Sequence, residues 1–293
     1  MAGIQVQNNM KIKKFNKRII KKVLSYTILI LFTVFFFFPF FIMLMRSFMT
    51  NEEVLYDLPE RIFPSAFYLG AYKSVFSVKM LYFFKNTLII VLCNVIGSPL
   101  TASMCAFAFT KLKFKCRNFW FSVMMGTIML PGITLQIPMY IIYSVLGWTR
   151  TSLPLIVPAF LGGGASSVFL IMQFMKGIPK DLNEAAIIDG ANTFYIFIRI
   201  VIPLTLPIIT YFAINTFIAV WNDFMGPLMY LQKERTWTIA LAVYNMFRGE
   251  YKGQQYWNMQ MAAGVMLSLP CMILFCLFQK QLIEGVTFSG LKL

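Results

Sequence analysis

The feature that most constrains this chain is a series of long apolar runs separated by short polar segments. A helix needs about 20 apolar residues to cross the hydrocarbon core of a bilayer, and each run reaches that length. The composition agrees, since 59% of the residues are hydrophobic and 13% are charged. We therefore predict an all-α, polytopic membrane protein with six transmembrane helices. The expected spans cover approximately residues 23–45, 86–110, 119–146, 153–175, 200–223 and 259–278.

The net charge of +15 is distributed as membrane topology requires. Seven basic residues between Lys11 and Lys22 precede the first span, and four more lie between Lys111 and Arg117, with no acidic residue in either stretch. Cytoplasmic loops carry such an excess of Lys and Arg. Both stretches are therefore expected in the cytoplasm, and six spans place both termini there. We expect no nucleic-acid partner, because the charges do not form one basic groove.

The first apolar run is expected to remain as a membrane helix. A secretory signal peptide has a shorter apolar core of about 7–15 residues and a small-residue cleavage site, and neither occurs here. We divide the chain into a basic cytoplasmic arm (residues 1–22), a six-span domain (residues 23–279) and a cytoplasmic tail (residues 280–293). Membrane lipid is a partner that this organisation requires.

The chain has little of the chemistry that an enzyme or a metal site needs. It contains no histidine, and its five cysteines form no C-x-x-C pair, so we expect no metal, no bound cofactor and no catalytic residue. The glycine run at 162–164 lacks the G-K-[ST] ending of a phosphate loop, so the chain is not expected to hydrolyse ATP. Acidic residues lie only in loops and at span ends, whereas an autonomous transporter usually carries an ionisable residue within a span. The energy is therefore expected to come from another subunit.

Polar side chains inside the expected spans are candidates for a substrate pathway. Pro131, Gly132 and Pro138 interrupt the third span, and such a break must face protein or water because lipid cannot satisfy the freed backbone groups. Gln136 lies within that break. Helix packing is the alternative explanation for polar residues of this kind. The uncharged amides that we assign to the pathway are Asn94, Gln136, Asn215 and Asn222.

The segment between the fourth and fifth spans begins with a short amphipathic helix. We expect it to run over about 181–189, and Gly190 suits the position just after its last turn. At about 100° per residue, Leu182, Ala185 and Ala186 fall on one face of that helix. The two alanines leave a shallow surface that another protein can approach closely.

A second helix is expected after this turn. Thr193 is a suitable N-cap, and aromatic and aliphatic residues then continue to Pro203 and Pro207. By shape alone, the whole segment fits an ordinary cytoplasmic connector equally well.

The spacing of residues in this segment is the most specific signal in the chain. Glu184-Ala185-Ala186, Gly190 and Ile200-Val201-Ile202-Pro203 fit the pattern E-A-A-x3-G-x9-I-x-L-P, with Ile202 in place of the leucine. In this respect the chain resembles the permease subunits of binding-protein-dependent ABC importers. The resemblance implies the type I importer permease fold and a location in the bacterial cell membrane.

Other residues resemble the carbohydrate branch of that family, and within it the six-span maltose-permease type. They include Ile137-Pro138-Met139-Tyr140 and Trp221-Asn222. The tail is similar to the pattern E-G-x-T-x-G-x-x-K, which matches Glu284, Gly285, Thr287 and Lys292 but has Ser289 at the second glycine.

The resemblance also implies a role for each residue of the segment. The helix at 181–190 would be the coupling helix that docks on a cytoplasmic ATPase subunit. Leu182, Ala185 and Ala186 would form its docking face, Glu184 and Asp189 would make polar contacts, and Gly190 would permit the turn.

The partners follow from the same resemblance. A second homologous permease subunit would complete the pathway, two cytoplasmic ATPase subunits would hold ATP and Mg, and an extracytoplasmic solute-binding protein would deliver a sugar substrate at the outer loops. The loop at about 226–257, rich in aromatic residues, is expected among these. Two alternatives remain at this point. One is an importer for a non-sugar solute such as a peptide or polyamine, and the other is a secondary transporter or channel.

Overall fold

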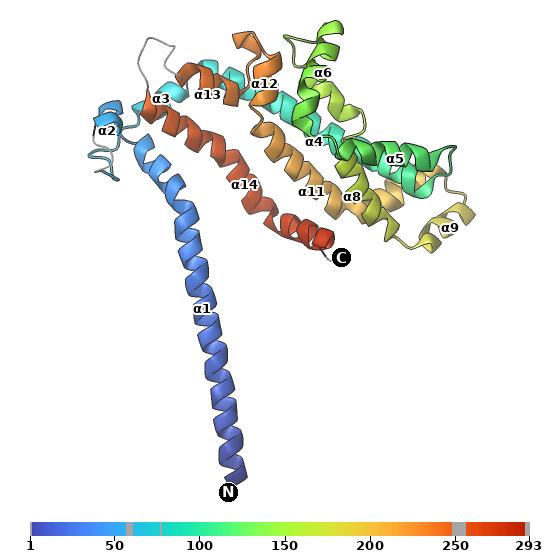
Figure 1. The fold of residues 1–293 in the computed structure, drawn as a ribbon, viewed down its shortest axis with the longest axis horizontal. Coiled ribbons are helices and arrows are strands. Elements are labelled where there is room, and N and C mark those ends of the chain that lie inside the picture. Colours follow the sequence, from blue (N-terminus) through green and yellow to red (C-terminus); the bar gives the residue numbers. More distant parts are fainter. Residues whose placement is uncertain (1, 57–60, 77, 248–255, 291–293) are drawn as a thin grey trace. The chain divides into compact units, whose positions relative to one another are not determined.

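The computed structural model describes residues 2–56, 61–76, 78–247 and 256–290, and within them the side chains of all but 2–18, 78, 180, 246–247 and 283–290. These residues form helices joined by short turns, with no strand among them, so the all-α prediction is confirmed. Figure 1 labels the longer elements. In chain order the elements are α1 (Ala2–Ser47), α2 (Asn51–Tyr56), α3 (Gly70–Val75), α4 (Val78–Lys111), α5 (Arg117–Ile128), α6 (Gly132–Val145), α7 (Leu153–Ile156), η1 (Val157–Phe160), α8 (Ala165–Lys176), α9 (Lys180–Ile188), α10 (Thr193–Ile196), the π-turn η2 (Phe197–Val201), α11 (Ile202–Trp221), α12 (Met225–Tyr230), η3 (Glu234–Thr236), α13 (Ile239–Phe247) and α14 (Trp257–Gly290).

Five stretches of the described chain are long and apolar enough to cross a bilayer, and a sixth arises if one sharply bent helix pair counts as a span. The bent pair is α5 with α6, whose axes meet at 106°. The five are Ile19–Ser47, Lys79–Lys111, Leu153–Lys176, Thr193–Trp221 and Trp257–Leu282. The fold agrees with the prediction of a six-span polytopic protein. The sixth span is obtained only if α5 and α6 are counted as one span across the bend.

The bend lies at the predicted interruption of the third span. Pro131 precedes α6 with an extended backbone, and its missing N–H removes a helical hydrogen bond at that point. Pro138, in contrast, lies inside α6 and does not end it. The predicted span at 119–146 is therefore two helices rather than one continuous crossing, and its single break lies at Pro131.

The fourth span is also broken, between η1 and α8. Gly162, Gly163 and Gly164 all have positive φ, a conformation that glycine adopts without a steric penalty. A Cβ on Gly163 would overlap the backbone oxygen of Ser98, so α4 lies too close for any other residue there. The glycine run is thus a turn that packs closely against α4.

The fifth span begins earlier than predicted and continues past its prolines. Asn192, not Thr193, caps α10, since its side chain accepts a 2.8 Å hydrogen bond from the backbone N–H of Tyr195. Pro203 and Pro207 lie within the first turns of α11, which then continues to Trp221. The predicted span at 200–223 likewise contains both prolines, and the structure extends it back to Thr193. A proline is tolerated in a first turn, and the π-turn η2 precedes both residues.

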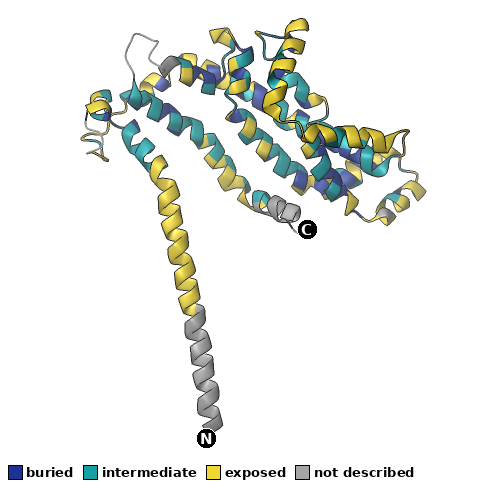
Figure 2. Cartoon of the chain, viewed as in Figure 1, coloured by how far each residue is buried: buried dark blue, intermediate teal, exposed yellow. Residues whose placement is uncertain are grey.

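The chain divides into two compact units, residues 1–75 with 256–265 and residues 76–255 with 266–293. In the first unit, the hydroxyls of Ser47 and Tyr72 lie 2.7 Å apart, and the Asn258 amide donates to the Met49 carbonyl at 3.2 Å. Residues 19–38 of α1 are exposed along their whole length, as Figure 2 shows. α1 also runs unbroken across residue 22, where a separate arm was expected to end.

The second unit contains the larger core. Its buried residues come from α4, α8 and the segment from α9 to α11, and they include Ala106, Met175, Ala186 and Val201. Aromatic packing contributes as well, since the Phe107 and Phe197 rings lie 5.1 Å apart. This core joins the helix at 180–188 to three membrane-spanning elements of the same unit.

Candidate functional site

The candidate site is α9 with the turn that follows it. The backbone N–H of Gly190 bonds to the Ile187 carbonyl at 3.0 Å, and that of Ala191 bonds to the Ala186 carbonyl at 2.9 Å. This pair of bonds defines a Schellman motif, in which the residue after the helix adopts a left-handed conformation. Gly190 has φ +82°, so the prediction of a glycine cap after the helix is confirmed.

One face of α9 is exposed and another is anchored in the chain's own core. Leu182 is 45% exposed and Ile188 is 85% exposed, and Ala185 is exposed between them. Ala186 is only 9% exposed and packs with the core residues of α4 and α8. The predicted docking face therefore divides: Leu182 and Ala185 are open to a partner, whereas Ala186 faces inward. Helical periodicity alone does not place Ile188 on the exposed side.

The charged residues of this segment are open to solvent. Glu184 and Asp189 are exposed, and neither side chain makes a hydrogen bond or an ion pair within the described part of the chain. Arg199, on the π-turn, is exposed and free in the same sense. Unpaired charges at a helix end are available to a partner surface.

A cavity of about 540 Å³ lies beside the turn. It combines the end of α9 with the start of the next helix, and its walls are half polar in character. The residues that line it are Ala186, Asp189, Gly190, Ala191, Asn192, Tyr195, Arg199 and Ile200. Three of the predicted coupling residues thus contribute to one concave surface, together with Arg199, which the sequence reasoning did not single out.

The π-turn η2 is a second feature that the sequence reasoning missed. It lies between the turn at Gly190 and the long helix α11, and two of its residues, Phe197 and Val201, are buried in the core. Single π-turns inside helices occur frequently at functional sites. Pro203 and Pro207 were the available signal, because proline lacks the N–H that would donate to the carbonyl of the preceding turn.

Asn94 belongs to a polar row on α4 that satisfies the backbone of the broken fourth span. Its amide donates to the Leu155 carbonyl at 2.8 Å and to the Ile90 carbonyl at 2.9 Å. One and two turns further on, Ser98 donates to the Gly163 carbonyl at 3.2 Å and Thr101 to the Ala159 carbonyl at 3.0 Å. Breaking a membrane helix frees carbonyls that lipid cannot satisfy, and α4 supplies the donors. The geometry thus gives Asn94 a structural role.

The other predicted pathway residues have no such long-range bond. Asn215 and Asn222, both exposed on α11, donate only to the carbonyl four residues earlier in their own helix at 2.8 Å, apart from a 3.7 Å contact of Asn222 with the Cys271 sulfur. With Ala219, also exposed, they form a row at spacings of four and three residues, which is one face of a helix. Gln136 is half-buried in α6 and makes no hydrogen bond to a described residue.

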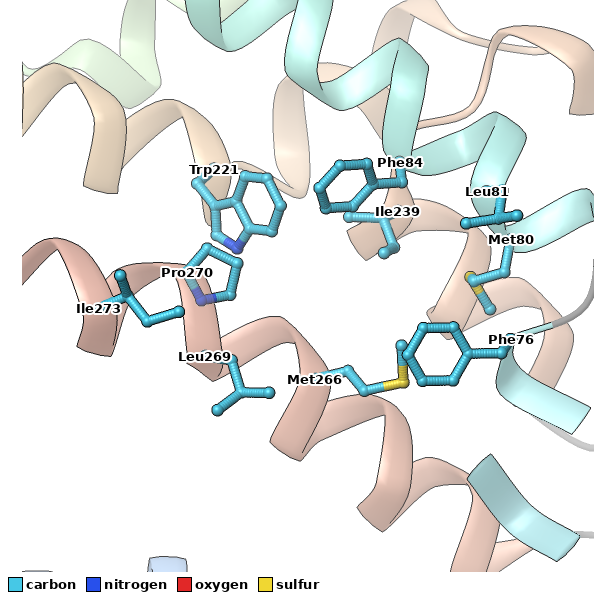
Figure 3. A pocket seen from close by; sticks show the side chains of 10 residues that line it. All are labelled: Phe76, Met80, Leu81, Phe84, Trp221, Ile239, Met266, Leu269, Pro270 and Ile273. Atoms are coloured by element: carbon cyan, nitrogen blue, oxygen red, sulfur yellow. The ribbon is translucent and has the colours of Figure 1, made fainter. Parts of the chain in front are cut away.

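A second cavity, of about 270 Å³, lies between α4, α11, α13 and α14 (Figure 3). Apolar side chains surround it, and the indole N–H of Trp221 is already bonded to the Leu267 carbonyl at 2.9 Å. A sugar needs hydrogen-bonding partners, so this cavity does not suit it. The lining residues are Phe76, Met80, Leu81, Phe84, Trp221, Ile239, Met266, Leu269, Pro270 and Ile273.

The segment after α11 is held by internal contacts. Burial raises the pKa of the Asp223 carboxyl above its ordinary value of 3.8, although it accepts a 3.1 Å bond from the Gly226 N–H. The ring of Trp237 lies 6.2 Å from that of Phe83, and Tyr244 packs edge-on against another aromatic ring. These aromatics of the expected outer loop therefore pack within the chain. Residues 248–255, which include Tyr251, lie outside the described part.

A metal site needs several His, Cys, Asp or Glu side chains close together. Among the side chains that the structure describes, no three His, Cys, Asp or Glu residues gather as a metal site would require. What this arrangement offers is an exposed helix held on a buried core, and a row of uncharged amides further along α11.

Known proteins are similar to this chain over most of its length. Residues 97–287 match the family described as binding-protein-dependent transport system inner membrane component. The arabinooligosaccharides transport system permease protein AraQ of Halalkalibacterium halodurans is 31% identical over 258 residues, which is 87% of this chain and 91% of that protein. The trehalose/maltose transport system permease protein MalG of Thermococcus litoralis is 30% identical over 279 residues, which is 94% of this chain and 99% of that protein.

The fold has a solved counterpart. A chain in the crystal structure of a bacterial ABC transporter involved in the import of the acidic polysaccharide alginate has a TM-score of 0.78 with this chain at 19% identity. The match covers 89% of this chain and 96% of that chain. At this level of identity the likeness concerns the fold, and it extends over nearly the whole of both chains.

Proposed function

The chain belongs to the family of binding-protein-dependent transport system inner membrane components, and from this membership we propose that it is the permease subunit of an ATP-driven importer of sugars or oligosaccharides. It is a transport subunit of the membrane rather than an enzyme. ATP and Mg would bind to a separate ATPase subunit, and α9 would couple the two.

The observation that carries the coupling role is the divided face of α9. Its exposed side, with Leu182, Ala185 and Ile188, has no cover within the described residues of the second unit. Its inner side is fixed through Ala186 to buried residues of α4 and α8. Protein cores are close-packed and transmit displacements, so a force on the exposed side would move these helices together. A docking helix needs both properties.

The substrate class follows from the uncharged amides on α11. This helix carries no charged residue, and Asn215 and Asn222 present exposed amides on one face. Amides offer the paired donors and acceptors that sugar hydroxyls need. Relatives named for the transport of arabinooligosaccharides and of trehalose and maltose support this assignment.

The same face of α11 supports a second permease chain. Exposed amides in a membrane-spanning helix are unfavourable against lipid and are found facing a bundle interior or a water-filled passage. A homologous chain placed against this face would enclose the passage. A solute-binding protein would deliver the substrate, as the family description implies, and a related alginate transporter has been solved with such a protein bound.

The test is to identify what α9 touches. A photo-crosslinking residue would replace Ala185, and a matched control would replace Ile141, an exposed residue on α6. In native membranes we expect the Ala185 position to crosslink to an ATPase subunit and the Ile141 position not to. The tagged full chain alone should show no ATP turnover, and the complex it retains should show turnover that the transported sugar, with its binding protein, stimulates.

Two results would contradict the proposal. One is ATP turnover by the purified chain alone. The other is an Ala185 position that crosslinks only to lipid or to proteins without an ATPase site. If an ATPase is captured but no sugar stimulates it, the coupling role stands and the substrate class is wrong.

A further inference from the structure

The loop that joins α4 to α5 contains a basic pocket beside an exposed aromatic strip. We propose that this pocket binds the phosphate headgroup of an anionic membrane lipid and that the lipid's acyl chains lie along the exposed face of α5. The proposal concerns a surface apart from α9 and from the amides of α11, and it does not depend on the transported substrate.

The pocket has a volume of about 450 Å³ and is formed within a few residues of the loop and of the first turn of α5. Two cations, Lys113 and Arg117, contribute to its walls, and neither makes an ion pair or a side-chain hydrogen bond to any described residue. The residues that line it are Lys113, Phe114, Cys116, Arg117, Asn118 and Phe119.

Nothing acidic in the neighbouring sequence can neutralise these cations. The chain has no Asp or Glu between Glu60 and Asp181, a stretch that contains α4, α5, α6 and α8 entirely. An anion from outside the chain is therefore the available counter-charge. Arg presents a planar fork that matches phosphate oxygens, Lys adds a compact point charge, and the Asn118 amide is a further donor in the same pocket.

The surface next to the pocket identifies the kind of anion. α5 buries none of its own residues, and Phe119 and Trp120 are 61% and 55% exposed. Val123 is also exposed, and at about 100° per residue its position on the helix falls between those of Phe119 and Trp120, so the three form one continuous strip. Phe121 and Met124 point the other way and pack against the core. Aromatic residues beside basic ones are typical of the interface between headgroups and acyl chains.

A lipid has a charged headgroup and apolar chains, so it fits the basic pocket and the apolar strip of α5 at once. A free phosphate ion would use only the pocket, and an acidic protein surface would leave the apolar strip without a partner. Basic pockets on membrane helices bind the headgroups of anionic lipids, and the strip gives the attached chains a place to lie. The headgroup end of this lipid would then be next to Leu112, which packs against the core that holds Ala186 of α9.

The test uses the full-length chain in mixed micelles and measures quenching of tryptophan fluorescence by brominated lipids. The probes are brominated phosphatidylglycerol, which is anionic, and brominated phosphatidylcholine, which has no net charge. We expect saturable quenching by the first and weak quenching by the second. Replacing Trp120 by Phe should remove the part of the quenching by which phosphatidylglycerol exceeds phosphatidylcholine, which would show that the anionic lipid lies on the strip of α5.

The variants separate a defined pocket from a diffusely basic loop. Lys113→Gln and Lys115→Gln remove the same charge two residues apart, but only Lys113 lines the pocket. Each basic residue near an anionic surface contributes about a fivefold factor in binding. We expect an approximately fivefold loss for Lys113→Gln, about 25-fold when it is combined with Arg117→Gln, and less than twofold for Lys115→Gln.

Three results would overturn the proposal. Equal losses for Lys113→Gln and Lys115→Gln would mean that only the net charge of the loop matters. Displacement of phosphatidylglycerol by millimolar inorganic phosphate would indicate a free-anion site. Unchanged lipid binding in both pocket variants would mean that the lipid headgroup does not bind in the cavity, and would favour an acidic surface of another protein as its partner. Arg117→Lys, which keeps the charge, together with a single symmetric elution peak for every variant, controls for misfolding.

Discussion

The turn at Gly190 allows a quantitative test of the coupling proposal. Its φ of +82° lies in the left-handed region, and the two bonds of the Schellman motif hold it there. A Cβ built on Gly190 would meet no atom within 4 Å, so a larger residue causes no clash. The only cost of Gly190→Ala is therefore the backbone conformation itself, which is about 1–2 kcal/mol for an L-residue.

That cost sets the size of the expected effect. A free-energy difference of about 1–2 kcal/mol changes the ratio of the native turn to its alternatives by about 5- to 30-fold. We expect Gly190→Ala to weaken the bond from Ala191 to Ala186 and to lower uptake per ATP hydrolysed by up to this factor. Gly190→Asn provides the matched comparison, because Asn enters the left-handed region far more readily than Ala.

The assay measures uptake and ATP turnover in the same proteoliposomes, with both variants reconstituted at equal protein content. The expected order of uptake per ATP is wild type, then Gly190→Asn, then Gly190→Ala. Hydrogen exchange at the Ala191 amide reports on the turn independently of transport. Equal behaviour of the Ala and Asn variants would refute the backbone argument. Normal coupling together with rapid exchange at Ala191 would refute the requirement for this turn.

Three further predictions concern stability and the amides. Gly163→Ala should abolish stable folding, because its Cβ would overlap the α4 backbone. Gly164→Ala meets no atom within 4 Å and has only the backbone cost of its φ of +89°, so it should accumulate in the membrane to a higher level than Gly163→Ala, as immunoblotting would show. The raised pKa of Asp223 means that its ionisation destabilises the fold, so the contribution of Asp223 to stability is largest below pH 3.8 and is lost as the pH rises through the folded-state pKa. Asp223→Asn should therefore unfold at a higher temperature than wild type at pH 7, and the difference should vanish at low pH. Asn94→Ala should cost about 1–3 kcal/mol by leaving the half-buried Leu155 carbonyl without its donor. Asn215→Ala should leave the unfolding temperature unchanged and alter the relative uptake of different sugars.

Local rules of helix termination explain why the turn at Gly190 was predictable from the sequence. A glycine after an amphipathic segment satisfies the Schellman geometry without help from distant residues. The inward position of Ala186 was not predictable in the same way. Periodicity places Leu182, Ala185 and Ala186 near one another on the helix, but it does not indicate where the rest of the chain lies. Only the packing of α4 and α8 decides which of them is buried.

The breaks in the spans also differ in how far local sequence rules predict them. Pro131 predicts the bend between α5 and α6 because a missing N–H is a local property. The course of the fifth span is harder to predict, since Pro203 and Pro207 are accommodated by a π-turn that begins six residues before the first of them. Sequence patterns therefore locate a disturbance in a helix more reliably than they determine whether the helix ends there.

The amides of the spans show why polarity alone does not identify a pathway. Asn94 and Asn215 are the same residue in the same kind of helix, yet the first bonds to a carbonyl 61 residues away and the second only to its own helix. An amide bonded to its own helix can exchange that bond for one to a ligand without disturbing the packing. An amide that satisfies a broken span cannot, because its release would leave a carbonyl unpaired in an apolar surrounding. Among the four predicted residues, this criterion favours Asn215 and Asn222 for the pathway and assigns Asn94 to the scaffold that supports it.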